Sequence, residues 1–121
     1  MLALVTLLFS AADFALLKDS APNRQPQIAS HGREVALTFG AGNTVYFASS
    51  RDAGYTWTEP RAVSSQGVLS LGMRRGPRIA FASGGESIVI SAIVGEKGHG
   101  ADGDLIAWRS TFLCRKTPTG P

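Results

Sequence analysis

The chain after Ser20 is divided into short apolar runs separated by turn-forming residues, and this pattern constrains the fold more than any other feature. The runs 34–39, 44–49 and 87–94 are rich in β-branched and aromatic residues, and Gly, Asn or Ser stands between them. Runs of this length and composition, bounded by turn residues, are typical of β-strands. No segment after Ser20 shows a helical period, and Gly and Pro interrupt the chain too often for a coiled coil. The sequence therefore predicts an all-β fold.

Composition limits the classes of function. The 121 residues are enough for one small domain, and 44% hydrophobic against 17% charged residues excludes disorder driven by charge. One cysteine, Cys114, and two histidines can form neither a disulfide within the chain nor a Cys/His zinc set. The net charge of +3 comes from basic residues spread along the chain, without the interleaved aromatic residues of a base-stacking surface. We therefore expect no metal, no cofactor and no nucleic-acid partner.

Residues 1–19 form a strongly apolar segment centred on the run 2–9. This run is shorter than the roughly 20 helical residues that cross a bilayer, so no membrane span is expected. An apolar core followed by the small residues Ser10 and Ala12 is typical of a secretory signal peptide, although no Lys or Arg precedes it. The alternative is an amino-terminal helix, since Leu and Ala favour helices. The signal-peptide interpretation predicts a secreted or periplasmic protein.

The remaining sequence contains two similar halves. The segment 26–29 (Pro-Gln-Ile-Ala) recurs as 77–80 (Pro-Arg-Ile-Ala), 51 residues later, and the run 45–50 recurs as 105–110, 60 residues later. A repeat of about 50 residues with three or four antiparallel strands is the size of one β-propeller blade. The predicted units span about 22–63 and 77–111.

One motif connects the repeat with a known family. The segment Ser50-Arg51-Asp52-Ala53-Gly54-Tyr55-Thr56-Trp57 matches the Ser-x-Asp-x-Gly-x-Thr-Trp "Asp box" at every defined position. The chain thus resembles the sialidases and related BNR-repeat proteins, which are β-propellers of six blades, over residues 22–111. The resemblance implies that the box residues Ser50, Asp52, Gly54, Thr56 and Trp57 are structural and lie away from the substrate pocket. Their chemistry agrees, because Gly54 tolerates positive φ and Asp52 can accept hydrogen bonds from turn amides.

The second unit departs from this motif. Ser110 is present, but Phe112 stands where Asp is expected and Cys114 where Gly is expected. Residues 112–121 are therefore predicted to be an irregular tail, produced by a frameshifted coding sequence or by a divergent natural end. In either case the second blade is expected to lack its fourth strand. The expected partners of this chain are the other blades of the propeller.

The resemblance implies an exo-α-sialidase-like glycoside hydrolase whose substrate is a sialoside or another glycan. Such enzymes use a Tyr nucleophile with a Glu partner, an Asp acid/base, and three Arg that bind the substrate carboxylate. Arg78 is the candidate for one of these arginines, although Ala80 replaces the Pro of the family's Arg-Ile-Pro motif. Tyr46 and Tyr55 fall on a predicted strand and inside the box, so neither is expected to be a nucleophile. We therefore expect this chain to be inactive by itself; the alternative is a non-catalytic Asp-box module that binds a glycan or a protein.

Blade topology predicts which loops would meet at a pocket. In an antiparallel meander the box and the first-to-second strand turns share one end of the blade, whereas the second-to-third loops and the links between blades share the other. The resemblance places the pocket at this second end. The candidate pocket residues there are Arg74, Arg75, Glu96, His99, Asp102 and Asp104. The alternative is a solvated loop, and the residue order of an EF-hand is absent, so no metal site is predicted.

Overall fold

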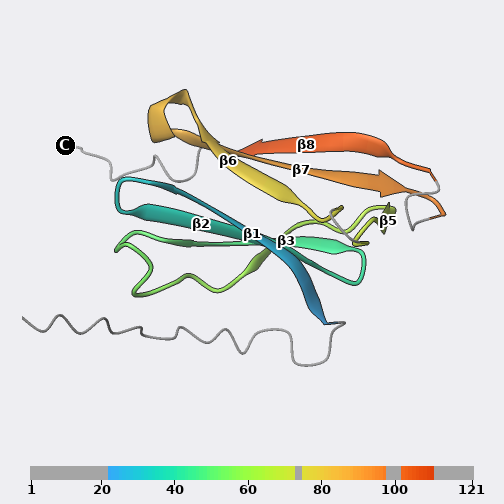
Figure 1. The fold of residues 1–121 in the computed structure, drawn as a ribbon, viewed down its shortest axis with the longest axis horizontal. Helices are drawn as coiled ribbons and strands as arrows, with labels where there is room; N and C mark the ends of the chain where they lie inside the picture. Colours follow the sequence, from blue (N-terminus) through green and yellow to red (C-terminus); the bar gives the residue numbers. More distant parts are fainter. Residues whose placement is uncertain (1–21, 73–74, 98–101, 111–121) are drawn as a thin grey trace, which may run out of the picture.

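The computed structural model describes residues 22–72, 75–97 and 102–110 (Figure 1). Its elements are β1 (Asn23–His31), β2 (Glu34–Ala41), β3 (Thr44–Ser50), β4 (Arg61–Ser64), β5 (Val68–Leu69), β6 (Arg78–Ala82), a 3-10 turn (Ser83–Gly85), β7 (Ser87–Gly95) and β8 (Asp104–Ser110). The described ranges contain no α-helix, so the all-β prediction is confirmed. Within the same ranges no helix is long and apolar enough to cross a membrane. The predicted segment 1–19 and the predicted tail 112–121 lie outside the described residues.

The first sheet, sheet A, is an antiparallel meander in the order β1-β2-β3-β4. Two-residue turns join its first three strands, because His31 pairs with Glu34 and Ala41 pairs with Thr44. Gly32 and Gly42 open these turns, each with φ of 62°, a conformation that glycine adopts without a steric penalty. The connection from β3 to β4 is the longer segment that contains the Asp box.

The second sheet, sheet B, is built around β7, which pairs with three other strands. β8 follows one edge of β7, while β6 and the short β5 share the other edge. β5 lies in the segment between the two predicted units, 22–63 and 77–111. Its two residues pair with Val94 and Gly95, and the amide of Ser70 donates to the carbonyl of Ile93 at 3.0 Å. Sheet B thus begins earlier than the predicted unit, which started at residue 77.

The two sheets pack face to face around one apolar core (Figure 1). Sheet A contributes Ala36, Val45 and Phe47 from β2 and β3. Ile88 lies on the opposing face of sheet B with only 1% of its surface exposed. The further core residues of sheet B and the adjoining segment are Leu69, Leu71, Ile90 and Ala92. Burial of these side chains is the main apolar contribution that joins the sheets.

The sheets are stacked in the same orientation, so that non-equivalent faces meet. In sheet B, Ile79 pairs with Ile90, and both pack against sheet A. Their equivalents by the sequence repeat are Ile28 and Leu37, which also pair with each other. These two lie on the face of sheet A that is turned away from sheet B, because side chains alternate along a strand and the next residue, Ala36, is in the core. Two sheets related by a two-fold axis would instead bury equivalent faces against each other.

Both outer faces of this two-sheet stack carry apolar side chains. No strand in the described ranges covers either face. On sheet A the rings of Phe39 and Tyr46 stack at 5.5 Å beside the exposed Ile28. The outer face of sheet B, read from strand alternation, carries Ala80, Val89, Ile93, Leu105 and Ala107. Strands that are apolar on both faces are typical of sheets covered on both sides.

The turns gather at two ends of the stack. At one end, which we call the box end, the amide of Ala53 in the Asp box donates to the carbonyl of Arg33 in the β1–β2 turn at 2.8 Å. His31 reaches sheet B at this end, with its ring 5.9 Å from that of Phe81. At the other end, the loop end, Asn43 Oδ1 accepts a hydrogen bond from the amide of Leu69 at 3.2 Å. This is the distribution of turns that the meander argument predicts.

Candidate functional site

The Asp-box loop is closed by a pair of hydrogen bonds where β3 ends. The amide of Thr58 donates to the carbonyl of Ser49 at 2.9 Å, and the amide of Ser49 donates to Thr58 Oγ1 at 3.0 Å. These bonds hold the two strands of the loop together immediately before β4 begins at Arg61. The intervening residues are therefore confined to a compact turn at the box end.

The carboxylate of Asp52 is the acceptor at the centre of this loop. Its Oδ1 accepts from Ser50 Oγ and from the amide of Thr56, both at 2.8 Å. Its Oδ2 accepts from Thr56 Oγ1 at 2.6 Å. The Thr56 hydroxyl, then the Thr56 amide and the Ser50 hydroxyl, lower the pKa of Asp52 from 3.8 to about 2, because each bond favours the charged form. Both oxygens are occupied inside the loop, so Asp52 is poorly placed to exchange a proton with a substrate.

The other box residues complete this hydrogen-bonded unit. Ser50 Oγ accepts from the amide of Gly54 at 2.8 Å, and Trp57 Nε1 donates to the Gly54 carbonyl at 2.9 Å. Ala53 and Gly54 have φ of 62° and 95°, and the left-handed region is readily available to glycine. All five residues of the sequence motif are thus joined by bonds to one another. The arrangement fixes the shape of the turn.

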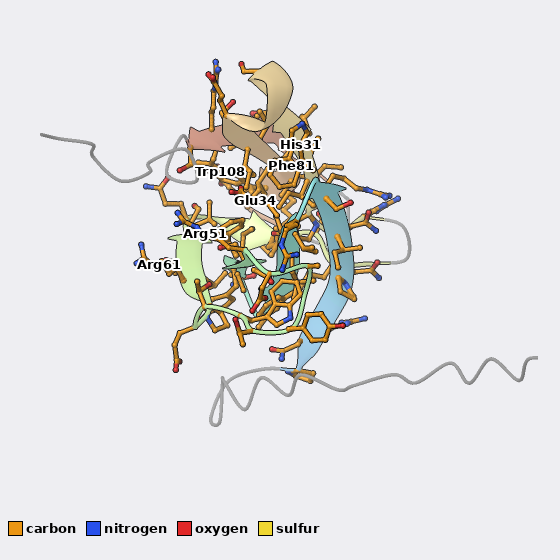
Figure 2. All side chains as sticks on the ribbon, turned by 90° about the vertical axis from the view of Figure 1, so that its left-hand side faces the viewer. His31, Glu34, Arg51, Arg61, Phe81 and Trp108 are labelled. Atoms are coloured by element: carbon orange, nitrogen blue, oxygen red, sulfur yellow. The ribbon has the colours of Figure 1, made fainter. Side chains whose placement is uncertain are left out.

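A polar hollow of about 560 Å³ lies beside the box. Two exposed arginines, Arg51 and Arg61, belong to its wall and lie on the same side of the molecule in Figure 2. The remaining lining residues are Ser49, Ser50, Thr56, Trp57 and Thr58. Within the described part of the chain, no acidic side chain lines this hollow. Its chemistry, two cations with hydroxyl groups and an indole, suits an anionic or sugar-like ligand.

The structure describes four of the six predicted pocket residues at the loop end, namely Arg75, Glu96, Asp102 and Asp104. Asp102 accepts from the amides of Glu96 and Lys97 at 3.1 and 2.9 Å, so its carboxylate holds its own loop. Glu96, Asp104 and Arg75 are exposed, while Arg74 and His99 lie outside the described residues. Among the residues that the structure describes, no group of three metal-ligating side chains is present.

Arg78 is the first residue of β6 and lies opposite Ser91. Strand alternation places it on the outer face of sheet B, since Ile79 packs into the core. It is exposed and lies toward the loop end, because β6 runs from the loop end to the box end. Tyr46 lies on the outer face of sheet A, and Tyr55 is exposed in the box loop. The structure therefore does not bring either tyrosine together with Arg78.

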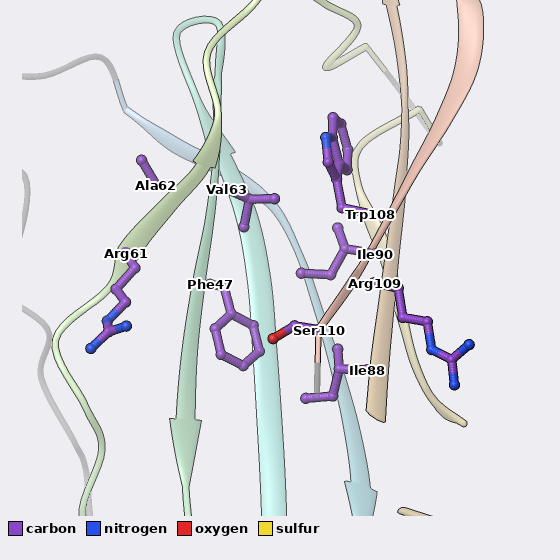
Figure 3. A pocket seen from close by; sticks show the side chains of 9 residues that line it. All are labelled: Phe47, Arg61, Ala62, Val63, Ile88, Ile90, Trp108, Arg109 and Ser110. Carbon is purple, nitrogen blue, oxygen red and sulfur yellow. The ribbon is translucent and has the colours of Figure 1, made fainter. Parts of the chain in front are cut away.

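Sequence reasoning missed a cavity of about 320 Å³ between the outer strands of the two sheets (Figure 3). Its walls are largely apolar, and Trp108 of sheet B lies across it from Val63 of β4. The full lining is Phe47, Arg61, Ala62, Val63, Ile88, Ile90, Trp108, Arg109 and Ser110. Arg109 points away from it, where its guanidinium donates to Ser83 Oγ and its Nε to Ser87 Oγ. No local pattern predicts this cavity, because its residues come from four separate strands.

Comparison with known proteins adds no assignment. No family model, no curated protein and no solved structure matches this chain. Its function is therefore argued from the residues and their geometry.

Proposed function

We propose that the chain forms two neighbouring blades of a sialidase-like Asp-box β-propeller. The larger protein would be a glycoside hydrolase that acts on a sialoside or a related glycan outside the cytoplasm. The observation that carries this proposal is the stacking of sheets A and B in the same orientation. In a ring of blades every sheet must present the same face to the sheet before it, and the packing of sheet B on sheet A supports an arrangement of this kind.

The position of the Asp box supports the same proposal. The box follows the third strand of sheet A and precedes the fourth, as the sialidase resemblance implies. Its hydrogen bonds leave the Asp52 carboxylate occupied within the loop. A structural role for the box follows from this geometry, and we assign it no part in hydrolysis.

Hydrolysis would require groups beyond those of these two blades. Arg78 is the residue that we assign to the substrate carboxylate, because a guanidinium can form a bidentate, charge-assisted pair with it. The carboxylates of Asp52 and Asp102 are both used by their own loops. We therefore expect the nucleophile, its partner and two further arginines to come from other blades.

The hollow beside the box favours a second candidate function, a non-catalytic module that binds an acidic glycan. Arg51 and Arg61 would contact the anionic groups, and hydroxyls of the lining would contact the sugar. This site lies at the box end, away from the loop end that the sialidase resemblance assigns to a substrate pocket.

A fluorogenic sialoside separates the two functions. The purified 121-residue chain is expected to release no fluorophore. Turnover by this chain that disappears in Arg78→Ala would contradict our assignment of catalysis to further blades. In a longer polypeptide that includes those blades, hydrolysis supports the enzyme. Retention of the polypeptide on an immobilised acidic glycan, weakened by Arg51→Ala or Arg61→Ala and without hydrolysis, supports the binding module.

A further inference from the structure

We infer that the apolar cavity between the sheets and the polar hollow beside the Asp box form one groove, and that its ligand is a free amphiphilic carboxylate. The alkyl chain of the ligand lies in the cavity, and its carboxylate lies at Arg61 and Arg51. The inference shares these arginines with the glycan-binding candidate. It needs no sugar, however, and it uses the cavity, which has no part in the proposed function.

The cavity and the hollow adjoin along β3 and β4. Side chains alternate along a strand, so Phe47 in the cavity and Ser49 in the hollow lie on the same face of β3, toward sheet B. Arg61, the first residue of β4, pairs with Phe47 and lines both spaces. The two spaces therefore meet at Arg61.

The polarity of the groove changes along its length. Figure 3 shows Trp108 opposite Val63 in the apolar part of the cavity. Ser110, the last residue of β8, lies nearer the box end than Trp108, and its hydroxyl points toward Phe47. Arg61 lies at the box end of β4, because this strand runs antiparallel to β3. The apolar walls are thus followed by hydroxyl and guanidinium groups in the direction of the Asp box.

The charge of the hollow selects an anion. Arg51 and Arg61 are exposed in its wall, and no acidic side chain of the described ranges lines it. Figure 2 shows both arginines on the same side of the molecule as Trp108. A guanidinium can donate two charge-assisted hydrogen bonds to one carboxylate. The carboxylate of an amphiphile is therefore placed in the hollow, and its apolar part is placed in the cavity.

The volume of the cavity suits an alkyl chain. An apolar cavity of about 150 Å³ holds benzene, and the volume here is about 320 Å³. The space therefore accepts a chain of roughly ten carbon atoms. Contact with Trp108 and Ile90 removes this chain from water, which is the main source of its affinity. Because the cavity lies between the two sheets, the ligand enters as a single free molecule rather than as part of a bilayer.

Titration calorimetry with decanoate tests the inference on the full 121-residue chain, at concentrations below the onset of micelles. Hexanoate is the control with a short chain, and decanol is the control without a charge. Each methylene that enters the cavity should tighten binding by up to roughly fourfold, so decanoate should bind at least about tenfold more tightly than hexanoate. Decanoate should also bind more tightly than decanol, and only the binding of decanoate should weaken as the salt concentration rises.

The terminal bromine of ω-bromodecanoate locates the alkyl chain. Bromine quenches tryptophan fluorescence on contact, and Trp57 and Trp108 are the two tryptophans of this protein. In Trp57→Phe only Trp108 emits. Quenching in this variant is expected, because Trp108 lines the cavity that the alkyl chain enters.

Matched variants test the two parts of the groove separately. Arg61→Gln should weaken decanoate binding by about tenfold and leave decanol binding unchanged. Arg24→Gln, exposed at the loop end of β1, should change neither affinity. Val63→Phe fills the cavity and should weaken the binding of both ligands. If Val63→Phe is unfolded by circular dichroism, Ser110→Leu narrows the cavity from the opposite wall at an exposed position.

Four results would overturn the inference. The first is that decanoate does not bind. The second is an equal affinity for decanoate and decanol, or for decanoate in Arg61→Gln and Arg24→Gln, because the arginines would then not hold the carboxylate. The third is an alkyl chain that leaves Trp108 unquenched or an affinity that the filled cavity does not change. The fourth is binding only to decanoate micelles or anionic vesicles, which would indicate a surface rather than a site for one chain.

The proposed function fails or succeeds by different measurements. Sialoside turnover does not depend on any of these ligands. Retention on an acidic glycan that is weakened by Arg51→Ala but not by Val63→Phe would support the glycan-binding candidate even where decanoate does not bind.

Discussion

Ser50→Ala removes the hydroxyl that organises the Asp-box loop, and we expect it to destabilise the fold measurably. Ser50 is only 2% exposed. Its Oγ accepts the amide of Gly54 at 2.8 Å and donates to Asp52 Oδ1 at the same distance. Alanine fills nearly the same space, but it can neither accept the hydrogen bond from the Gly54 amide nor donate one to Asp52 Oδ1. The loss therefore reports on hydrogen bonding rather than on packing.

The amide of Gly54 gives the size of the effect. Leaving a buried donor without its acceptor costs about 1–3 kcal/mol. Gly54 is half-buried, so water can recover part of this loss. A small domain has a total stability of roughly 5–15 kcal/mol. With a urea m-value of about 2 kcal/mol/M, a loss of about 2 kcal/mol lowers the unfolding midpoint by about 1 M.

Urea unfolding followed by tryptophan fluorescence measures this change, since Trp57 lies in the loop and Trp108 lies in the cavity between the sheets. All variants are compared at one protein concentration, because association shifts apparent stability. Ser65→Ala is the control, as Ser65 is exposed just after β4. Surface substitutions of this kind change stability by no more than about 0.5 kcal/mol. If Ser50→Ala and Ser65→Ala unfold at the same urea concentration, the box does not stabilise the fold as argued.

Two further predictions follow from the same contacts. The pKa of Asp52 falls from 3.8 to about 2 on folding, so its stabilisation is complete above the unfolded value and is lost as pH decreases through the folded value. Asp52→Asn should lower the melting temperature at neutral pH and approach wild type near the folded pKa, whereas parallel melting curves across this range would exclude the mechanism. At Gly40 a side chain would collide with Leu71 and approach Leu69, so Gly40→Val should cost about 1–3 kcal/mol in urea unfolding. Gly72 has open space around it, so Gly72→Ala should leave the unfolding midpoint unchanged. Equal midpoints for the Gly40 and Gly72 variants would mean that Leu69 and Leu71 do not pack closely on Gly40.

Local features of the chain could be predicted from sequence because local physics determines them. The strands β2 and β3 follow from apolar runs separated by Gly42 and Asn43. The Asp-box turn follows from residues within eight positions of one another, because side-chain hydrogen bonds of Ser50, Asp52 and Thr56 close inside that segment. The repeat of Ile28 as Ile79 also predicts two sheets, and each isoleucine pairs with the strand that follows its own along the chain.

Features that depend on contacts between distant segments could not be predicted. β5 has only two residues, and it pairs with β7, a strand that is distant in the sequence and not joined to it by a hairpin turn. Asp102 belongs to an acidic, glycine-rich loop. This composition suits a ligand site, and it equally suits a loop whose carboxylate accepts hydrogen bonds from its own backbone amides. The cavity beside Trp108 depends on how the outer strands of the two sheets diverge. Sequence periodicity contains no information on that divergence.

The same-way stacking of the sheets has a consequence for how such a chain can evolve. In a sandwich of two sheets related by a two-fold axis, the equivalent apolar faces are both buried against each other. A duplicated third sheet would then have no apolar face on which to pack. Here each sheet carries one face of each type, so a duplicated unit of about 50–60 residues can be accommodated by an interface that already exists. Gene duplication can therefore lengthen the protein in whole sheets without selecting a new contact each time. Mutations after duplication would then refine individual pairs, as the exchange of Gly40 for Ile93 already does between these two units.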